Sequence, residues 1–305
     1  MKSLNLKKTL GLATSIAGGL YLLKLKDPAS AHPCMNERHT QDGGDTDTRA
    51  HGNKLIAAVT NIPDAKKRHR GGEDGFLLTR ELIAVADGVG GWNRKGVDPG
   101  IFARELCGHV WNDYKSHKGK GDLSLRQLLV DAVAKTKATG TSTFAMALID
   151  EQHAFLKTLN LGDSGFMIVR PQDTGEFEVL FRSKEQQYRF NYPYQCGTNY
   201  GPPNHADTFV HSVRNNDLVV LATDGVLDNL FNENIVDCLK KHIAGQLDTE
   251  VQLAATCIAR SAELRSYQKD YDSPFAVNAR AAGRSHPGGK KDDITVIVGK
   301  VSLEA

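Results

Sequence analysis

An α+β fold built around antiparallel sheets is what the sequence predicts, on three observations. Short apolar runs of strand length come in blocks, with helical patterns in blocks beside them, and lack the strict alternation of a parallel βαβ sheet. No segment of about 20 to 50 residues repeats along the chain. Apolar residues make up 40% and charged residues 24% of the 305 residues, which suffices to bury a core and excludes wholesale disorder.

Charge and cysteine content exclude further classes of protein. Lys and Arg number 38 against 36 Asp and Glu, a net charge of +2, so we expect no nucleic-acid partner. The cysteines are scattered and form no Cys-x-x-Cys pair, which indicates neither a zinc cluster nor a disulfide framework. We expect them to be small buried thiols. They are Cys34, Cys107, Cys196, Cys238 and Cys257.

Residues 1–26 form a leader that differs from the rest of the chain. They contain lysines but no acid, which favours a mitochondrial presequence, although such leaders prefer arginine. The uncharged segment 9–23 would span only ~22 Å as a helix, short of the ~30 Å hydrocarbon core. Lysines on both sides of it suit a short membrane anchor, and Ala-Ser-Ala at 29–31 is typical of a secretory signal. We expect mitochondrial localisation, with the secretory pathway or membrane association through 9–23 as alternatives.

A polar linker follows the leader and precedes the globular domain. Residues 27–50 are rich in Asp, Gly and Thr, which is typical of a linker. The domain is therefore predicted to occupy residues 51–305.

The first part of the domain is predicted to contain three strands and then two helices. The strands are Lys54–Thr60, Gly75–Thr79 and Glu81–Ala86. The third strand is almost continuously apolar and ends in Asp87-Gly88, a turn pair. Asp98 can cap a helix that begins at Pro99, and a second helix covers Ser124–Ala138. One face of the first helix carries Ile101, Phe102, Leu106 and Val110.

Four strand candidates open the second part, and helices follow later. The strands are Thr143–Asp150, Ala154–Leu161, Gly165–Arg170 and Phe177–Arg182. The long polar segment Ser183–Ala206 reads as a surface insertion. A hairpin is expected from Thr208–Val213 and Leu218–Thr223, joined by the turn Arg214–Asp217. The remaining elements are the helices Glu233–Ala244 and Thr249–Tyr267, the loop Gln268–Lys291 and the strand Ile294–Val301.

Acidic residues gather where the predicted strands begin or end. They are Glu73-Asp74, Asp87, Asp224, Asp228 and Asp292-Asp293. A single Asp-Gly after a strand is usually only a turn, but several carboxylates held close together would repel unless a cation lay among them. All-oxygen ligands suit Mg²⁺ or Mn²⁺, and the histidines and cysteines lack zinc-ligand spacing. The pattern predicts a divalent metal site, where paired ions can bind a phosphate and activate a water.

Six motifs follow one another between residues 51 and 303. They are Glu73-Asp74, Asp87-Gly88-Val89-Gly90-Gly91-Trp92, Gly140–Thr143, Leu161–Ser164, Asp224–Asp228 and Gly289–Thr295. In this order they resemble the metal-dependent protein phosphatases, the PPM or type 2C serine/threonine phosphatases. The resemblance implies an αββα sandwich of two antiparallel sheets flanked by helices. It also implies hydrolysis of phosphoserine and phosphothreonine on proteins by a water activated between two Mg²⁺ or Mn²⁺ ions. The sequence DGVGGW and the later DDITV look most like the small, often mitochondrial branch of this family.

The resemblance also implies which residues bind the two ions. Asp87 would bridge both ions. Glu73 and the backbone carbonyl of Gly88 would bind one of them, and Asp224 and Asp292 would bind the other.

The resemblance also assigns secondary roles in metal binding to three further acids. Asp163 and Asp228 match residues linked to a weaker third ion, and Asp74 matches an acid of the outer coordination shell. Phosphoprotein substrates are the implied partners, and we expect the chain to be a monomer.

Two departures from the family pattern stand out. Many relatives carry a histidine after the bridging Asp-Gly as a candidate proton donor, whereas this chain has Val89. Many relatives bind the substrate phosphate through an arginine at the position of His69. Arg68 and Arg70 flank this histidine, and we expect one of them to reach the phosphate, because a guanidinium matches phosphate oxygens. The alternative is that this basic run is only a solvated loop.

Proteins of other classes fit the sequence less well. Gly162–Gly165 matches the nucleophile motif of trypsin-like proteases, but Phe166 replaces the next glycine and no suitable upstream histidine is apparent. Gly88–Gly91 is too short for a dinucleotide fingerprint. The stronger rival is a catalytically weak pseudophosphatase that binds phosphoproteins, although each of the four principal acids is in place.

Overall fold

The structure is a computed structural model that describes residues 52–243 and 249–304. The predicted leader (1–26) and linker (27–50) lie outside the described residues. Among the helices of the described part, none is both long enough and apolar enough to span a bilayer.

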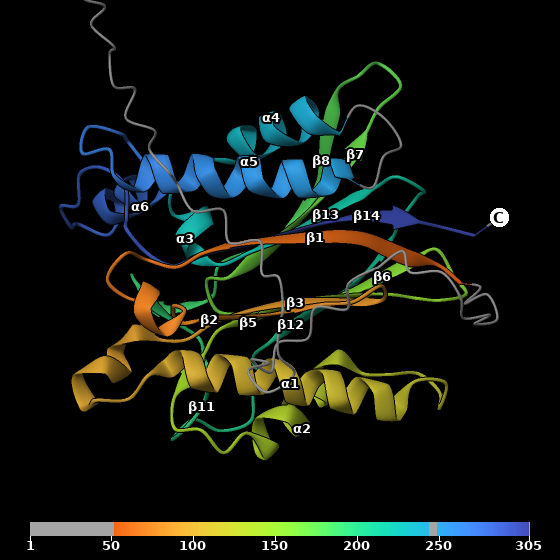
Figure 1. The fold of residues 1–305 in the computed structure, drawn as a ribbon, viewed down its shortest axis with the longest axis horizontal. Helices are drawn as coiled ribbons and strands as arrows, with labels where there is room; N and C mark the ends of the chain where they lie inside the picture. Colours follow the sequence, from red (N-terminus) through yellow and green to blue (C-terminus); the bar gives the residue numbers. More distant parts are fainter. Residues whose placement is uncertain (1–51, 244–248, 305) are drawn as a thin grey trace, which may run out of the picture. The chain divides into compact units, whose positions relative to one another are not determined.

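Two antiparallel sheets of five strands each form the centre of the domain (Figure 1). The first sheet has the order β1 (Lys54–Ile62), β14 (Ile294–Ser302), β13 (Leu218–Ala222), β7 (Gly165–Pro171) and β8 (Phe177–Arg182). The second has the order β12 (Asp207–Ser212), β6 (Phe155–Leu161), β5 (Phe144–Ile149), β3 (Leu82–Asp87) and β2 (Asp74–Leu78). Two small pairs add β9 (Gln187–Arg189) with β10 (Tyr192–Pro193), and β4 (Thr141–Ser142) with β11 (Cys196–Gly197).

Helices cover the outer face of each sheet (Figure 1). α1 (Pro99–His117) and α2 (Leu125–Lys135) pack on the second sheet, whereas α4 (Asn232–His242) and α5 (Thr249–Ser266) lie over the first. The short helices α3 (Asp224–Leu227) and α6 (Pro274–Ala281) lie toward one end. The order of layers is helix, sheet, sheet, helix, so the predicted αββα sandwich is confirmed.

The core has three layers, and the central strands contribute to two of them. In β3, Leu82, Ala84 and Ala86 pack with the helix-side cluster, whereas Ile83 and Val85 pack between the two sheets. Successive side chains of a strand point to opposite faces. A strand that is covered on both faces must therefore be apolar at every position, which explains the continuous apolar run in this segment.

Most predicted elements are confirmed, with boundaries shifted by a few residues. The first helix begins as expected, because the Asp98 side chain accepts a hydrogen bond from the Gly100 N–H and Pro99 occupies the first turn. Phe102 on this helix is buried, but Ile101 is 54% exposed, so its assignment to the apolar face is wrong. Ile101 lies one position, about 100° of helical turn, from Phe102, which points it away from the sheet.

The predicted hairpin of Thr208–Val213 and Leu218–Thr223 is wrong. β12 pairs with β6 in one sheet, whereas β13 pairs with β7 and β14 in the other. The chain crosses between the sheets at this point, and Asp217 anchors the crossing. Its carboxylate accepts hydrogen bonds of 2.7 and 2.6 Å from Arg170 and of 2.7 Å from the Arg214 N–H. A short turn between two strands does not reveal which sheet each strand joins.

The predicted loop Gln268–Lys291 contains a helix, α6. Its start carries capping residues, because the Ser273 hydroxyl accepts a hydrogen bond of 3.1 Å from the Ala276 N–H and Pro274 opens the first turn. The surrounding Gly, Arg and Lys residues concealed this signal. The insertion Ser183–Ala206 contains β9, β10 and β11 in short pairs.

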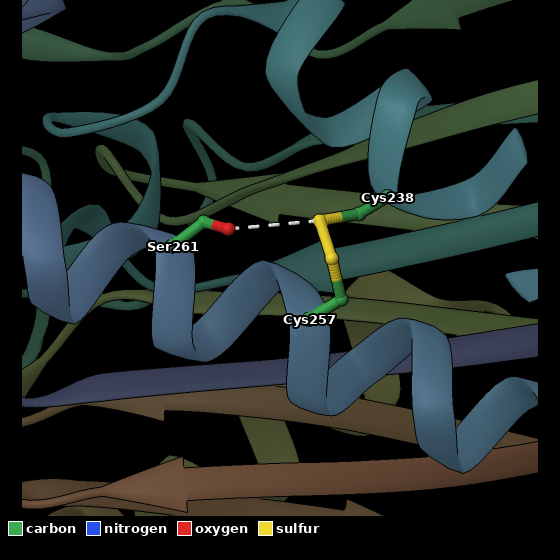
Figure 2. Close-up of a disulfide and its surroundings, with 3 residues drawn as sticks. All are labelled: Cys238, Cys257 and Ser261. Atoms are coloured by element: carbon green, nitrogen blue, oxygen red, sulfur yellow. Dashed lines mark hydrogen bonds between the residues drawn. A yellow bond between two sulfur atoms is a disulfide. The ribbon is translucent and has the colours of Figure 1, made fainter. Parts of the chain in front are cut away.

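A disulfide joins Cys238 on α4 to Cys257 on α5, with their Cα atoms 5.7 Å apart (Figure 2). The expectation of free thiols is therefore wrong for these two residues. It is confirmed for Cys107 and Cys196, which are buried thiols outside the disulfide, while Cys34 lies outside the described residues. The two bonded cysteines come together because α4 and α5 pack against each other, which their spacing in the sequence does not show.

Reducing this disulfide should lower the free energy of unfolding by about 3 kcal/mol, because the bond closes a loop across a sequence separation of 19. The measurement is urea unfolding with and without a thiol reductant. A Cys238→Ala, Cys257→Ala double variant is the control and should not respond to the reductant. Identical unfolding curves for the parent under both conditions would show that the two thiols are not joined.

Candidate metal centre

The predicted acids meet at one end of the sandwich because antiparallel pairing brings the relevant strand ends together. Asp74, which begins β2, lies opposite Asp87, which ends β3. In the first sheet, Ala222 near the end of β13 pairs with Val296 near the start of β14 and with Gly165 at the start of β7. The acids adjoin these ends: they are Glu73, Asp87, Asp163, Asp224, Asp228 and Asp292.

Asp74 ties the two sheets together beneath this end. Its Oδ2 accepts hydrogen bonds of 3.1 Å from Thr223 Oγ1 and 2.6 Å from Thr295 Oγ1, both of which belong to the first sheet's side of the sandwich. Burial, followed by the charge of Asp293, holds the pKa of Asp74 well above its usual range. This acid therefore has a clear structural role.

Three carboxylates approach one another closely. Asp87, Asp163 and Asp224 each offer an oxygen, and these oxygens lie within 4.8 Å of one another. Burial, and then the charge of Asp224, raises the pKa of both Asp87 and Asp163 well above the ordinary value. The Oδ1 atoms of Asp163 and Asp224 are buried and have no hydrogen-bond partner in the described residues. Unpaired buried oxygens in an all-oxygen cluster fit a hard divalent cation such as Mg²⁺ or Mn²⁺.

Lys67 forms ion pairs with a second group of acids. Its Nζ lies 2.7 Å from Glu73 Oε2, 3.0 Å from Asp292 Oδ1 and 2.9 Å from Asp293 Oδ2. Burial works to lower the pKa of Lys67, but the charges of Asp292 and Asp293 outweigh it and the pKa is raised. A divalent ion at Glu73 would therefore compete with this ammonium.

Lys290 forms ion pairs with a third group, made of Asp224, Asp228 and Asp292. Burial works to raise the pKa of Asp292, but the ammonium groups of Lys290 and Lys67 outweigh it and hold the pKa below its usual range. For Asp228, burial prevails over the opposing charge of Lys290 and raises the pKa to about 7. Asp292 thus lies between two lysines and links their groups.

The predicted phosphate-binding arginines lie close to these acids. Arg70 donates a hydrogen bond to Glu73 Oε1 and lies 3.7 Å from Asp98. Glu73 Oε1 also accepts a hydrogen bond of 2.6 Å from Asn93 Nδ2. Arg68 lines a small cavity that Asp292 also lines. Arg70 thus bonds directly to one of the acids, whereas Arg68 lies beside them without a described bond to any.

Lys67, Lys290 and Asp293 have roles that the sequence reasoning missed. Lys67 belongs to the same basic run as Arg68 and Arg70, but the sequence analysis predicts a role for the two arginines only. Lys290 lies inside the last motif. Asp293 is 2% exposed, and it accepts hydrogen bonds of 2.7 Å from the Asp64 N–H and 3.0 Å from the Glu73 N–H. The available signal was a lysine adjacent to clustered acids, since such acids need a positive neighbour.

Glycine follows two of the acids because the backbone is crowded there. A Cβ on Gly88 would lie 2.6 Å from the Pro99 carbonyl oxygen, and a Cβ on Gly225 only 1.9 Å from the Asp293 carbonyl oxygen. Neither glycine has a positive φ, so close approach of other backbone, and not backbone conformation, explains the two glycines. The absence of a side chain allows separate segments of the chain to approach closely at the site.

Gly225→Ala should cost about 1–3 kcal/mol of unfolding free energy, because the segment bearing Asp293 must move to admit a methyl group. Gly91→Ala is the matched control, since a Cβ there would meet nothing within 4 Å. That control should stay within about 0.5 kcal/mol of the parent. Urea unfolding measures both variants, and equal stability of the two would contradict the crowding.

The fold and site define a class: an αββα sandwich with an acidic centre at one end of its two sheets. The family described as Protein phosphatase 2C matches residues 74–256. The chain belongs to the protein phosphatase 2C family.

Individual relatives agree with this assignment. The chain is 36% identical over 280 residues to the probable protein phosphatase 2C 80 of Arabidopsis thaliana, covering 90% of this chain and 65% of that protein. It is 35% identical over 262 residues to the protein phosphatase PTC7 homolog fig of Drosophila willistoni, covering 80% of this chain and 81% of that protein. The match to a second Arabidopsis thaliana relative, the probable protein phosphatase 2C 55, covers only 52% of that protein's length.

Solved structures share the fold. The photosystem II phosphatase PBCP is 31% identical with a TM-score of 0.72, and the match covers 81% of this chain and 99% of that one. The catalytic domain of the serine/threonine phosphatase PstP, solved with 2 manganese ions, has a TM-score of 0.56 over 82% of this chain and 99% of that one. At 17% identity, the likeness to PstP shows the fold alone.

Proposed function

We propose that this chain hydrolyses phosphoserine and phosphothreonine on proteins and requires Mg²⁺ or Mn²⁺ to do so. The observation that carries the proposal is the group of Asp87, Asp163 and Asp224, two of which have unpaired buried oxygens. Membership of the protein phosphatase 2C family supplies the reaction class.

The proposed ion ligands are the residues of this cluster and its neighbours. Asp87, Asp163 and Asp224 would hold divalent cations, and Glu73, Asp292 and the carbonyl of Gly88 would complete the set. Divalent cations bound there supply a Lewis acid for the phosphate and lower the pKa of an attacking water.

The chain's own cationic groups would orient the phosphoryl group. Arg70 lies next to Glu73 at the acids, and its planar guanidinium matches two phosphate oxygens at once. Arg68 lies beside the same acids and is the second candidate. Val89 cannot donate a proton, so the proton for the departing serine or threonine oxygen comes from another group or from solvent.

Asp87→Asn should lower kcat by at least ~10³, equal to ~4 kcal/mol of barrier, because the change removes a charge that the cations need. The fold should survive, since losing one of several crowded carboxylates relieves repulsion. The measurement is Mn²⁺-dependent hydrolysis of a phosphothreonine peptide, together with melting temperature. Asp173→Asn, at an exposed position between β7 and β8, is the matched control and should keep parental activity.

Several outcomes would contradict this function. Full activity in EDTA would exclude the divalent ions, and more than about a tenth of parental activity in Asp87→Asn would remove that residue from the centre. An inactive parent that still binds the phosphopeptide at saturating Mn²⁺ would favour the pseudophosphatase.

We also propose that residues 1–26 direct the chain to mitochondria, because they contain lysines but no acid. A reporter fused to residues 1–50 should enter mitochondria, because the leader is positively charged without any acid before Asp27. The matched control replaces the lysines of 1–26 by glutamate and should leave the reporter in the cytosol. A reticular signal from the unaltered leader would favour the secretory or anchor alternative, and a diffuse signal would exclude targeting.

A further inference from the structure

The ammonium group of Lys290 lies inside the acidic centre rather than at its rim. Its Nζ contacts Asp224 Oδ2, lies 2.7 Å from Asp228 Oδ2 and lies 3.4 Å from Asp292 Oδ2. The side chain is 15% exposed. Three carboxylates from two segments of the chain thus surround one lysine, as ligands surround a bound cation.

The backbone of Lys290 is held in place on both sides. Its N–H donates a hydrogen bond of 2.9 Å to Asn229 Oδ1, and its carbonyl oxygen accepts one of 2.7 Å from Asn229 Nδ2. Asn229 is completely buried and also donates to the Gly225 carbonyl at 2.9 Å. The ring of Phe275 covers the ammonium at 5.1 Å. These contacts leave little freedom for the side chain to swing out to solvent.

The two oxygens of Asp224 face different partners. Oδ2 accepts a hydrogen bond from Lys290, whereas the buried Oδ1 has no hydrogen-bond partner in the part of the chain that the structure describes. Asp163 likewise keeps an unpaired Oδ1 and belongs to the same close group as Asp224 and Asp87. Asp228, in contrast, directs its Oδ2 at the lysine. The unpaired buried oxygens of Asp163 and Asp224 thus belong to the group that includes Asp87, and not to the group around the lysine.

We propose that Lys290 is a built-in cation that takes the position a further divalent ion would need beside Asp228, so that the centre holds two divalent ions rather than three. An ion bound to Asp228 would lie within a few ångströms of a fixed ammonium, where like charges repel strongly. The expectation of a weaker third ion at Asp163 and Asp228 is then replaced: Asp163 serves the main centre and Asp228 serves the lysine. Lys290 acts through Asp224 and Asp228 and is a positioning residue. The inference rests on the proposed function only in assuming that divalent ions bind.

The test counts Mn²⁺ ions bound per chain, using the electron paramagnetic resonance signal of free Mn²⁺ during a titration. The parent should bind two ions, as in other two-metal centres. Lys290→Met should bind a further, weaker ion, because the methionine keeps the length of the side chain without its charge. Adding Asp228→Asn to Lys290→Met should remove that extra ion.

Two further variants make the comparison independent of how well Lys290→Met folds. Asp228→Asn in the parent background should leave the count at two, since the lysine rather than an ion occupies that position. Lys291→Met is the matched control, because the neighbouring ammonium lies 4.5 Å from the centre of the Tyr267 ring and, within the described residues, forms no ion pair with Asp224, Asp228 or Asp292. It should leave the count unchanged.

The inference fails if the parent binds three ions and Asp228→Asn loses one of them. It also fails if folded Lys290→Met, checked by circular dichroism, binds no more ions than the parent. A parent that binds no Mn²⁺ would overturn both this inference and the proposed function. If two ions bind but the phosphothreonine peptide is not hydrolysed, the inference stands and the proposed function fails.

Discussion

Repulsion among buried carboxylates is the constraint on which the rest of this structure depends. Several strands of two sheets deliver acids to one end of the sandwich, and burial raises the pKa of Asp87 and Asp163 because water no longer screens them. Two lysines, each placed among carboxylates, offset this negative charge. Without fixed positive charge, closing the two sheets over these acids would be costly. The geometry of the centre is a balance between this repulsion and its neutralisation.

Contacts between the two sheets hold the acid-bearing segments in place. Asp74 on β2 accepts hydrogen bonds from Thr223 and Thr295, so the strands that carry the acids cannot slide past one another. Gly225 allows the segment at Asp293 to come within direct backbone contact. Asp87 ends β3, and Glu73, Asp163 and Asp292 lie within two residues of a strand end, a placement that favours a rigid centre.

Sequence alone predicted much of the fold, because strands that are buried on both faces must be apolar at every position. Sequence also located the acids, since all of them except Asp228 lie within two residues of a strand end. Prediction from sequence failed for features that depend on which distant segments lie side by side in the fold. The partners of β12 and β13, and the pairing of Cys238 with Cys257, come from packing between distant segments. The roles of Lys67 and Lys290 were missed for the same reason, because a basic residue near an acidic motif does not show where its ammonium points.

The shared position of Asp292, between Lys67 and Lys290, has a consequence for how the protein matures. In small zinc domains the metal supplies the folding energy, and the apo chain is unfolded. Here the ammonium groups already neutralise much of the acidic end, so the newly made chain can complete its fold before any ion arrives. If the chain binds divalent ions as proposed, metal loading would follow folding and would respond to the supply of those ions. The same chain would then wait, folded and inactive, wherever those ions are scarce.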